Sequence, residues 1–149
     1  ESVKNISVDP DNEFNNIISL NVIESSQTLI VASPNKIVSI SPKEVLSKDY
    51  EVRDIIVNKE DIYIATIDGQ LIKLTASLNE VKSKKYKYAK FHALAFTDSL
   101  YAVESQGFLV NINSDFSKDS VYDFSFDNEE RMIAIGNRIY FDSKYITLP

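Results

Sequence analysis

The sequence has no cysteine and no tryptophan among its 149 residues, and it has only three glycines. Without cysteine, the chain forms no disulfide, no thiolate nucleophile and no cysteine-based zinc or iron–sulfur site. Three glycines, at positions 69, 107 and 136, provide no glycine-rich phosphate loop and no G-x-S-x-G nucleophile elbow. No apolar run approaches the roughly 20 residues of a membrane helix, so we predict no membrane span.

Basic residues are fewer than acidic ones, so the net charge is −6 and the isoelectric point is near 4.8. An acidic surface is a poor match for a phosphate backbone, so we predict no nucleic-acid partner. One basic cluster, KSKKYKY at Lys82–Tyr88, runs against this trend. Its lysines are typical of a solvated outer edge strand, where charge discourages edge-to-edge pairing.

The first residues, ESVKNISVD, have neither the basic start nor the apolar stretch of a signal peptide, and they include no Met. A mature form, a trimmed form and a fragment are all compatible with this start. The sequence predicts a soluble protein. Its compartment, periplasm or cytoplasm, stays open, since a chain without thiols tolerates either redox environment.

An internal repeat organises the chain. VRDIIVNKEDIYIATIDGQLIKLT and KFHALAFTDSLYAVESQGFLVNIN align with a shift of 38 residues, which places Ile62 on Leu100 and Gly69 on Gly107. A shorter copy, SLNVIESSQTLIVASPNKIVSIS, precedes them, and another, DFSFDNEERMIAIGNRIYFD, follows. We therefore expect one domain, 1–149, of four units at about 17–50, 51–88, 89–120 and 121–149, with an N-terminal strand in 1–16.

Each unit is predicted to contain short antiparallel strands, because apolar residues alternate with period two. The first strands are expected at Ile17–Val22, Asp54–Val57, His92–Phe96 and Tyr122–Phe126. A polar turn, a second strand, a tight turn with Asn or Gly and a third strand follow, and a polar fourth strand is expected in 80–88 and 118–124. The best helix candidate is Ser41–Tyr50, with a Ser cap and an early Pro, and it predicts one short turn at most.

Four antiparallel strands per unit resemble the blades of the β-propeller superfamily, of the degenerate WD40-like or quinoprotein-like kind. The resemblance covers residues 17–142 and rests on the strand pattern, since the Trp-Asp dipeptide is absent. It implies an all-β fold of about four antiparallel four-stranded blades, as half of a larger ring or as a small closed ring. A closed ring would use Val3–Asp9 to complete the last blade. A β-sandwich is the alternative.

The sequence predicts no catalytic site, no metal site and no cofactor. Asp123 and Asp127 are interpreted as solvated turn residues. A catalytic acid/base pair needs two different environments that push its pKa values apart, and the sequence gives no sign of such environments. Asp9–Glu13 resembles the front of a calcium loop but lacks its central Gly and distal Glu. His92, the only histidine, is read as a structural residue on an apolar strand.

The predicted binding surface is one rim of the propeller, where the turns between second and third strands lie beside the links between blades. The candidate protein-binding residues are Tyr50, Asp68, Lys90, Phe91, Gln106 and Asn137. Tyr50 and Phe91 are expected to be exposed anchors, because aromatic residues carry much interface energy. The alternative is that both rings are tucked between blades.

These observations favour a non-catalytic interaction scaffold that presents rim loops to a protein partner, or to a second copy that completes the ring. One alternative is an accessory or assembly factor of a larger complex, for instance a periplasmic respiratory one. Another is an enzyme with a site in the central funnel, for which Arg53, Asp54 and His92 are the candidate residues. Fold analogy alone does not choose among these functions.

Overall fold

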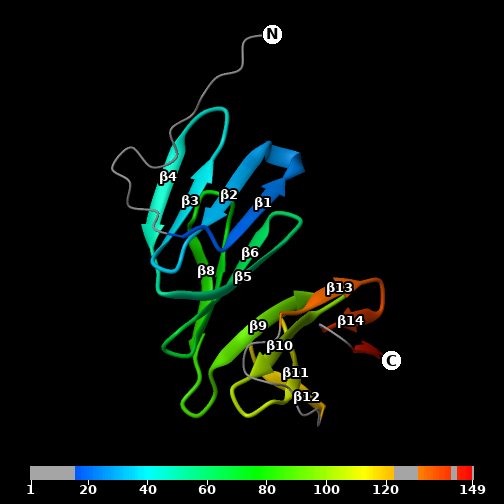
Figure 1. Cartoon of the computed structure of the whole chain (residues 1–149). Helices are drawn as coiled ribbons and strands as arrows, with labels where there is room; N and C mark the ends of the chain where they lie inside the picture. The colour runs from blue at the N-terminus through cyan, green and yellow to red at the C-terminus, as the bar shows by residue number, and fades with distance from the viewer. Residues whose placement is uncertain (1–15, 123–130, 142–143, 149) are drawn as a thin grey trace.

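The computed structural model describes residues 16–122, 131–141 and 144–148 (Figure 1). Several sequence predictions fall outside these residues and are not tested by the structure. They are the N-terminal strand in 1–16 apart from its last residue, the calcium-loop candidate Asp9–Glu13, and the turn residues Asp123 and Asp127.

The described residues form fifteen strands in four separate antiparallel sheets, each in simple up-and-down order. The first sheet contains β1 (Ser19–Ile23), β2 (Thr28–Ala32), β3 (Lys36–Ile40) and β4 (Val45–Asp49). The second contains β5 (Val52–Asn58), β6 (Asp61–Thr66), β7 (Gln70–Leu74) and β8 (Glu80–Lys85). The third contains β9 (Phe91–Phe96), β10 (Leu100–Glu104), β11 (Leu109–Ile112) and β12 (Lys118–Tyr122), and the fourth contains β13 (Ile133–Ile135), β14 (Arg138–Tyr140) and β15 (Tyr145–Thr147).

The middle sheets are apolar on both faces, which explains why their second and third strands read as nearly continuous apolar runs. In β6, Ile62 and Ile64 face the first sheet, whereas Tyr63 and Ala65 face the third. All four side chains are buried. A sheet covered on both faces gains from apolar residues at every position, and period-two alternation then disappears.

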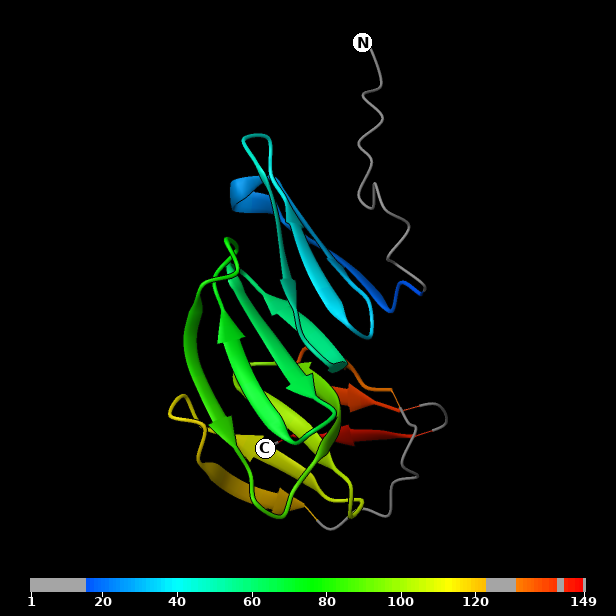
Figure 2. The same ribbon diagram turned by 90° about the vertical axis from the view of Figure 1, so that its left-hand side faces the viewer.

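The four sheets follow one another around a common axis, with their first strands innermost (Figure 2). β1, β5, β9 and β13 contact one another in that order. One buried apolar cluster lies between the first and second sheets, another between the second and third, and another between the third and fourth. This is the blade arrangement of a β-propeller, so the all-β prediction is confirmed and the alternative of a two-sheet sandwich is wrong.

The row of sheets is not closed into a ring in the described part of the chain, since none of its buried clusters combines the first sheet with the fourth. On the outer face of the first sheet, Leu20 and Val22 are more than half exposed, whereas Val31, Val38 and Ile40 are buried. On that of the fourth sheet, Ile133 and Ile135 are each 63% exposed. The described sheets therefore have the form of a partial propeller.

The predicted helical turn at Ser41–Tyr50 is wrong, because this segment forms a tight turn and then the outer strand β4. The Ser41 hydroxyl accepts a hydrogen bond from the Glu44 N–H at 3.1 Å, and the Ser41 N–H donates to the Glu44 carbonyl at 2.9 Å. β4 then pairs with β3 along its whole length. The cap and the early Pro suit this turn as well as a helix, and pairing with the sheet decides between them.

Two further predictions concern short segments. The polar turn expected after the first strand is present as the 3₁₀ turn η1 (Glu24–Ser26). Tyr122, expected to begin the first strand of the last unit, instead ends β12, where it pairs with Leu109. Apart from this single turn of three residues, the described chain has no helix, and so none that could cross a membrane.

Candidate functional site

One rim of the molecule is a continuous band of backbone hydrogen bonds between turns and interblade links. The Val52 N–H donates to the Pro34 carbonyl at 2.8 Å, and the Tyr86 N–H donates to the Gly69 carbonyl at 3.1 Å. The Ser105 N–H donates to the Lys90 carbonyl at 2.7 Å. In each of the first three sheets, the turn between the second and third strands is therefore held against a link between sheets. A rim built in this way presents its side chains from a rigid backbone.

A groove of about 550 Å³ lies on this rim between the second and third sheets. It is lined by eight residues from the β6–β7 turn, the end of β8 with the link after it, and the β10–β11 turn: Asp68, Lys85, Tyr86, Lys87, Tyr88, Ala89, Lys90 and Ser105. We call this feature the rim groove. Tyr88 is its most exposed aromatic side chain, with 78% of its surface accessible. The Lys87 ammonium lies 5.0 Å from the centre of the Tyr88 ring.

Electrostatics make the rim groove locally basic. Among the described residues that line it, Asp68 is the one acid, and its carboxylate accepts hydrogen bonds from Lys85 at 2.7 Å and from Thr66 at 2.6 Å. These bonds, first that from Lys85 and then that from Thr66, hold the pKa of the Asp68 carboxyl below its usual value. Asp68 therefore neutralises Lys85 at neutral pH, and Lys87 and Lys90 are left as the excess positive charge.

The structure brings together only some of the predicted binding residues. Asp68 and Lys90 line the rim groove, and Gln106 is exposed in the turn that follows the groove residue Ser105. Asn137 is exposed in the fourth sheet, in the β13–β14 turn. Tyr50 is half-buried against the apolar cluster between the first two sheets. Whether these residues bind a partner stays a prediction.

Phe91 is not an exposed anchor, which corrects the expectation for this residue. Its side chain is 1% exposed, inside the cluster between the second and third sheets. Its ring meets that of Tyr86 edge to face, with centroids 4.8 Å apart. The pairing of β9 shifts at His92, which places Phe91 on the face toward the second sheet while Ala93 and Ala95 face the fourth. Burial between the sheets is the cheaper outcome for a large ring.

Tyr88 is the functional candidate that sequence reasoning missed. It belongs to the basic cluster that we assigned to an edge strand, but β8 ends at Lys85 and Tyr88 lies in the link beyond it. The sequence offers no signal that separates Tyr88 from Tyr86, because both belong to the same lysine-rich cluster. Tyr86 packs against the buried cluster between the second and third sheets, whereas Tyr88 is left on the rim.

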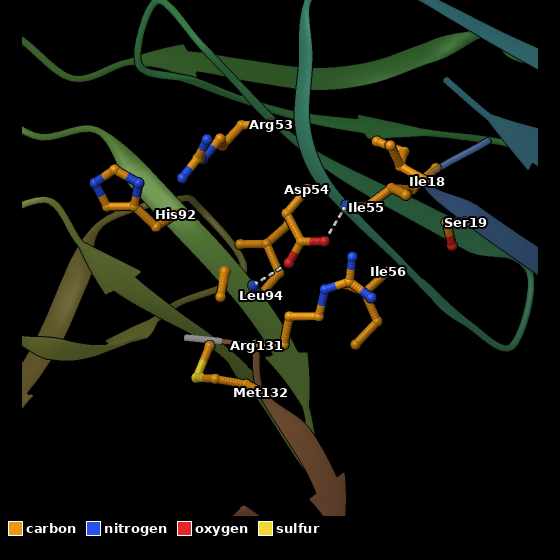
Figure 3. Close-up of a pocket in the computed structure, with 11 residues that line it drawn as sticks. Ile18, Ser19, Arg53, Asp54, Ile55, Ile56, His92, Leu94, Arg131 and Met132 are labelled. Carbon is orange, nitrogen blue, oxygen red and sulfur yellow. Dashed lines mark hydrogen bonds between the residues drawn. The ribbon is translucent and has the colours of Figure 1, made fainter. Parts of the chain in front are cut away.

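A second cavity, of about 430 Å³, lies at the inner strands around which the sheets are arranged (Figure 3). We call it the central cavity. It is lined by residues from the beginning of β1, from β5, from β9 and from the segment before β13: Ile18, Ser19, Arg53, Asp54, Ile55, Ile56, His92, Ala93, Leu94, Arg131 and Met132. The three funnel candidates, Arg53, Asp54 and His92, therefore do meet at one site. Arg131, from the last unit, joins them and was missed.

Asp54 is the acid at the centre of this cavity. Its carboxylate accepts hydrogen bonds from the Leu94 N–H at 2.7 Å, across to the next sheet, and from the Ile55 N–H at 2.9 Å (Figure 3). Burial raises the pKa of Asp54 to about 6, against the opposing effects of the two N–H groups, Arg131 and Arg53. The carboxylate thus joins β5 to β9, and both of its oxygens accept hydrogen bonds from backbone N–H groups.

His92 and the arginines supply the other polar groups. Burial, together with the positive charges of Arg53 and Lys90, lowers the pKa of His92, so the imidazole is neutral at pH 7. No group of three or more His, Asp or Glu side chains suitable for a metal occurs in residues 16–122, 131–141 and 144–148. The described polar side chains that line the central cavity include guanidinium, imidazole and carboxylate groups.

No known family model matches the sequence. Curated relatives include the plasminogen-binding protein PgbB of two Helicobacter pylori strains, J99 at 27% identity and 26695 at 26%. Each alignment covers 97% of this chain and 28% of the relative. The chain thus spans little more than a quarter of the length of the relatives that it matches.

Solved structures of similar shape are β-propellers. BamB from Moraxella catarrhalis superposes with a TM-score of 0.68 at 12% identity, covering 84% of this chain and 39% of that one. The C-terminal WD40 domain of Sif2 has a TM-score of 0.66 at 11% identity, covering 89% of this chain and 46% of that one. The WD40 propeller domain of Doa1 has a TM-score of 0.65, with coverage of 84% and 47%. The shared feature is the fold, and the chain corresponds to less than half of each structure.

Proposed function

We propose that this chain is a non-catalytic protein-binding module that holds a protein partner at the rim groove. The observation that carries this proposal is Tyr88, an aromatic side chain that is 78% exposed beside uncompensated lysines on a rigid rim. Aromatic residues next to positive charge are frequent anchors of protein interfaces. The curated relatives, which are named as plasminogen-binding, support the same class of function.

The groove also indicates the chemistry of the partner segment. Lys87 and Lys90 favour an acidic segment, and the ring of Tyr88 offers a flat apolar surface for an aliphatic or aromatic side chain. The Gly69 carbonyl and the Lys90 carbonyl already accept hydrogen bonds within the rim, so the backbone there is fixed before binding. A preformed surface loses little conformational entropy when a partner docks.

Plasminogen is the appropriate first probe, because both curated relatives are named plasminogen-binding proteins. Immobilised plasminogen should capture the wild-type chain, and Tyr88→Ala should weaken the equilibrium affinity by about tenfold or more, as loss of an interface anchor does. Lys87→Glu should weaken it further at low salt, since it reverses a charge that favours an acidic partner. Surface plasmon resonance at two salt concentrations measures both effects.

Matched controls separate the groove from the rest of the surface. Tyr88→Phe keeps the ring and should retain most of the affinity, and Lys43→Ala removes an exposed lysine from the distant β3–β4 turn. Equal affinities for wild type, Tyr88→Ala and Lys87→Glu would exclude the rim groove as the binding site. Failure of the wild-type chain to bind plasminogen would exclude that partner.

A further inference from the structure

A small pocket of about 230 Å³ lies between the second and third sheets, on the rim opposite to the rim groove. β10 begins at this pocket and ends at the rim groove, so the two sites lie at opposite ends of one strand. The floor of the pocket is apolar and buried, and it is formed by Tyr63, Leu100, Ile112 and Phe116. The half-buried ring of Phe96 lies beside them. We call this feature the aromatic pocket.

The aromatic rings of this pocket are packed together. The rings of Tyr63 and Phe96 stack with centroids 5.7 Å apart, and those of Tyr63 and Phe116 lie 6.5 Å apart. The repeat shows that a ring is not needed for the fold at Phe116. Leu78, 38 residues earlier, has a similar φ of 58° against 64° and forms the same 2.9 Å turn hydrogen bond, and it fills the space between the first and second sheets.

Two of these rings already have a cation of the chain over them. The Lys73 ammonium lies 5.6 Å from the centre of the Tyr63 ring, and the Lys82 ammonium lies 5.7 Å from that of Phe116. The face of an aromatic ring attracts positive charge. Within residues 16–122, 131–141 and 144–148, no lysine or arginine lies over Phe96. Phe96 is therefore the ring whose face is left for a cation from outside.

Asp98 supplies a negative charge next to this ring. It is exposed and lines the pocket two residues after Phe96. The Thr97 hydroxyl donates a hydrogen bond to its carboxylate at 2.8 Å and holds the pKa of Asp98 below its usual value, so the group is ionised at neutral pH. Lys73, which also lines the pocket, is paired with Asp61 at 2.8 Å. Among the described residues, Asp98 itself forms no ion pair.

We propose that the aromatic pocket binds an alkylammonium group, with its charge between the Asp98 carboxylate and the face of the Phe96 ring and its alkyl chain on the apolar floor. A volume of about 230 Å³ accommodates one lysine-sized group and is too small for a larger ligand. A lysine side chain of a protein partner and a free aliphatic amine share this chemistry. The proposal does not depend on the proposed function of the rim groove.

Nuclear magnetic resonance titration of the isotope-labelled chain tests this proposal with four-carbon probes that differ only in charge. n-Butylammonium should bind with a dissociation constant on the order of millimolar, the range expected for so small a ligand. n-Butanol has the same alkyl chain without the charge and should bind about threefold more weakly or worse, because it lacks the attraction to Asp98 and to the ring. Butyrate should not bind, since its charge is repelled by Asp98.

Substitutions separate the charge from the ring. Asp98→Asn should weaken n-butylammonium binding by about threefold to fivefold, as loss of an exposed ion pair does, and leave n-butanol binding unchanged. Asp119→Asn is the matched control, because Asp119 is an exposed acid on β12 outside the pocket. Phe96→Leu keeps an apolar side chain but removes the aromatic face, so it should weaken n-butylammonium more than n-butanol.

A blocked Gly-Lys-Gly tripeptide, acetylated and amidated at its ends, separates the two sources of the ligand. Binding at least as tight as that of n-butylammonium identifies a lysine side chain of a protein, and binding of n-butylammonium alone identifies a free amine. Both results support the alkylammonium site. Tyr88→Ala should bind n-butylammonium as wild type does, so this site and the rim groove are tested independently.

The proposal is overturned if n-butylammonium fails to bind wild type at tens of millimolar or binds no more tightly than n-butanol. Equal binding by Asp98→Asn and Asp119→Asn would also overturn it. Circular dichroism of each variant establishes that it is folded, and both acids are exposed, so neither substitution disturbs the core.

Discussion

At the scale of single residues, Gly69 shows how closely the rim is packed. Its φ of +87° lies in the region that L side chains rarely adopt, and a Cβ atom there would come within 2.8 Å of the Ala89 carbonyl oxygen. The same glycine offers its own carbonyl to the Tyr86 N–H. A turn of the second sheet and the link to the third therefore approach backbone to backbone, which only a residue without a side chain permits.

Gly69→Ala is expected to lower the free energy of unfolding by about 2–4 kcal/mol, from a left-handed conformation costing about 1–2 kcal/mol and a backbone clash. Gly136→Ala is the matched control. Gly136 also has a positive φ, of +60°, but nothing lies within 4 Å of its added Cβ, so only the smaller conformational cost applies. Urea unfolding followed by circular dichroism measures both, and equal losses would contradict the close approach at Gly69.

At the scale of elements, the contact between the second and third sheets depends on the β11–β12 turn. Phe116 in this turn is buried and packs against Tyr63 of β6, with ring centroids 6.5 Å apart. The Tyr86 hydroxyl donates a hydrogen bond to the Phe116 carbonyl at 2.5 Å. Burial raises the pKa of Tyr86 to about 12, so the hydroxyl keeps its proton throughout the neutral range. One turn thus joins the two sheets by packing and by a hydrogen bond.

Phe116→Ala should destabilise the protein by about 3–5 kcal/mol, because it removes a large buried ring and leaves a cavity. Tyr86→Phe removes only the hydroxyl and should cost about 1 kcal/mol. Chemical denaturation of both variants separates the packing contribution from that of the hydrogen bond. A loss for Tyr86→Phe as large as that for Phe116→Ala would show that the hydrogen bond, and not the ring, dominates this contact.

At the scale of the whole molecule, the outer face of the fourth sheet is the outstanding feature. Ile133 and Ile135 of β13 are each 63% exposed, and Tyr145 of β15 is 57% exposed on the same sheet. The opposite face of that sheet is buried against the third sheet through Ile139. A ring would cover the outer face with another blade. The chain covers 39% to 47% of three solved propellers, so its described sheets correspond to part of a ring.

We therefore expect the isolated chain to self-associate through this face, with the second copy taking the place of the next blade. Sedimentation velocity should show dimers whose proportion rises with concentration, and Ile135→Lys should shift the population to monomer by placing a charge in the apolar contact. Val81→Lys, at an exposed apolar position on the outer strand β8, is the control and should leave association unchanged. A wild-type chain that stays monomeric at high concentration would contradict the second copy as the occupant.

Much of the fold was predictable because it rests on local rules. The repeat of Gly69 at Gly107, each with a positive φ, identified the tight turns, and apolar pairs such as Ile62 and Leu100 identified equivalent strands. The outer strand β4 was missed because its sequence is polar and its turn resembles a helix cap. The funnel candidates Arg53, Asp54 and His92 do line one cavity, whereas Arg131 could not be assigned, since it lies in an irregular segment before a short strand.

By itself, the sequence determined that the chain folds into successive antiparallel sheets, because short apolar segments, turn residues and repeat length are properties of neighbouring positions. Only the tertiary structure decided which faces are buried, since that depends on how each sheet packs against the next. Tyr86 and Tyr88 show the difference, because both belong to one lysine-rich cluster, yet Tyr86 packs between the second and third sheets and Tyr88 is 78% exposed on the rim. The pairing shifts that leave Arg53 in β5 and His92 in β9 as extra residues are likewise set by pairing between strands, which no single strand encodes.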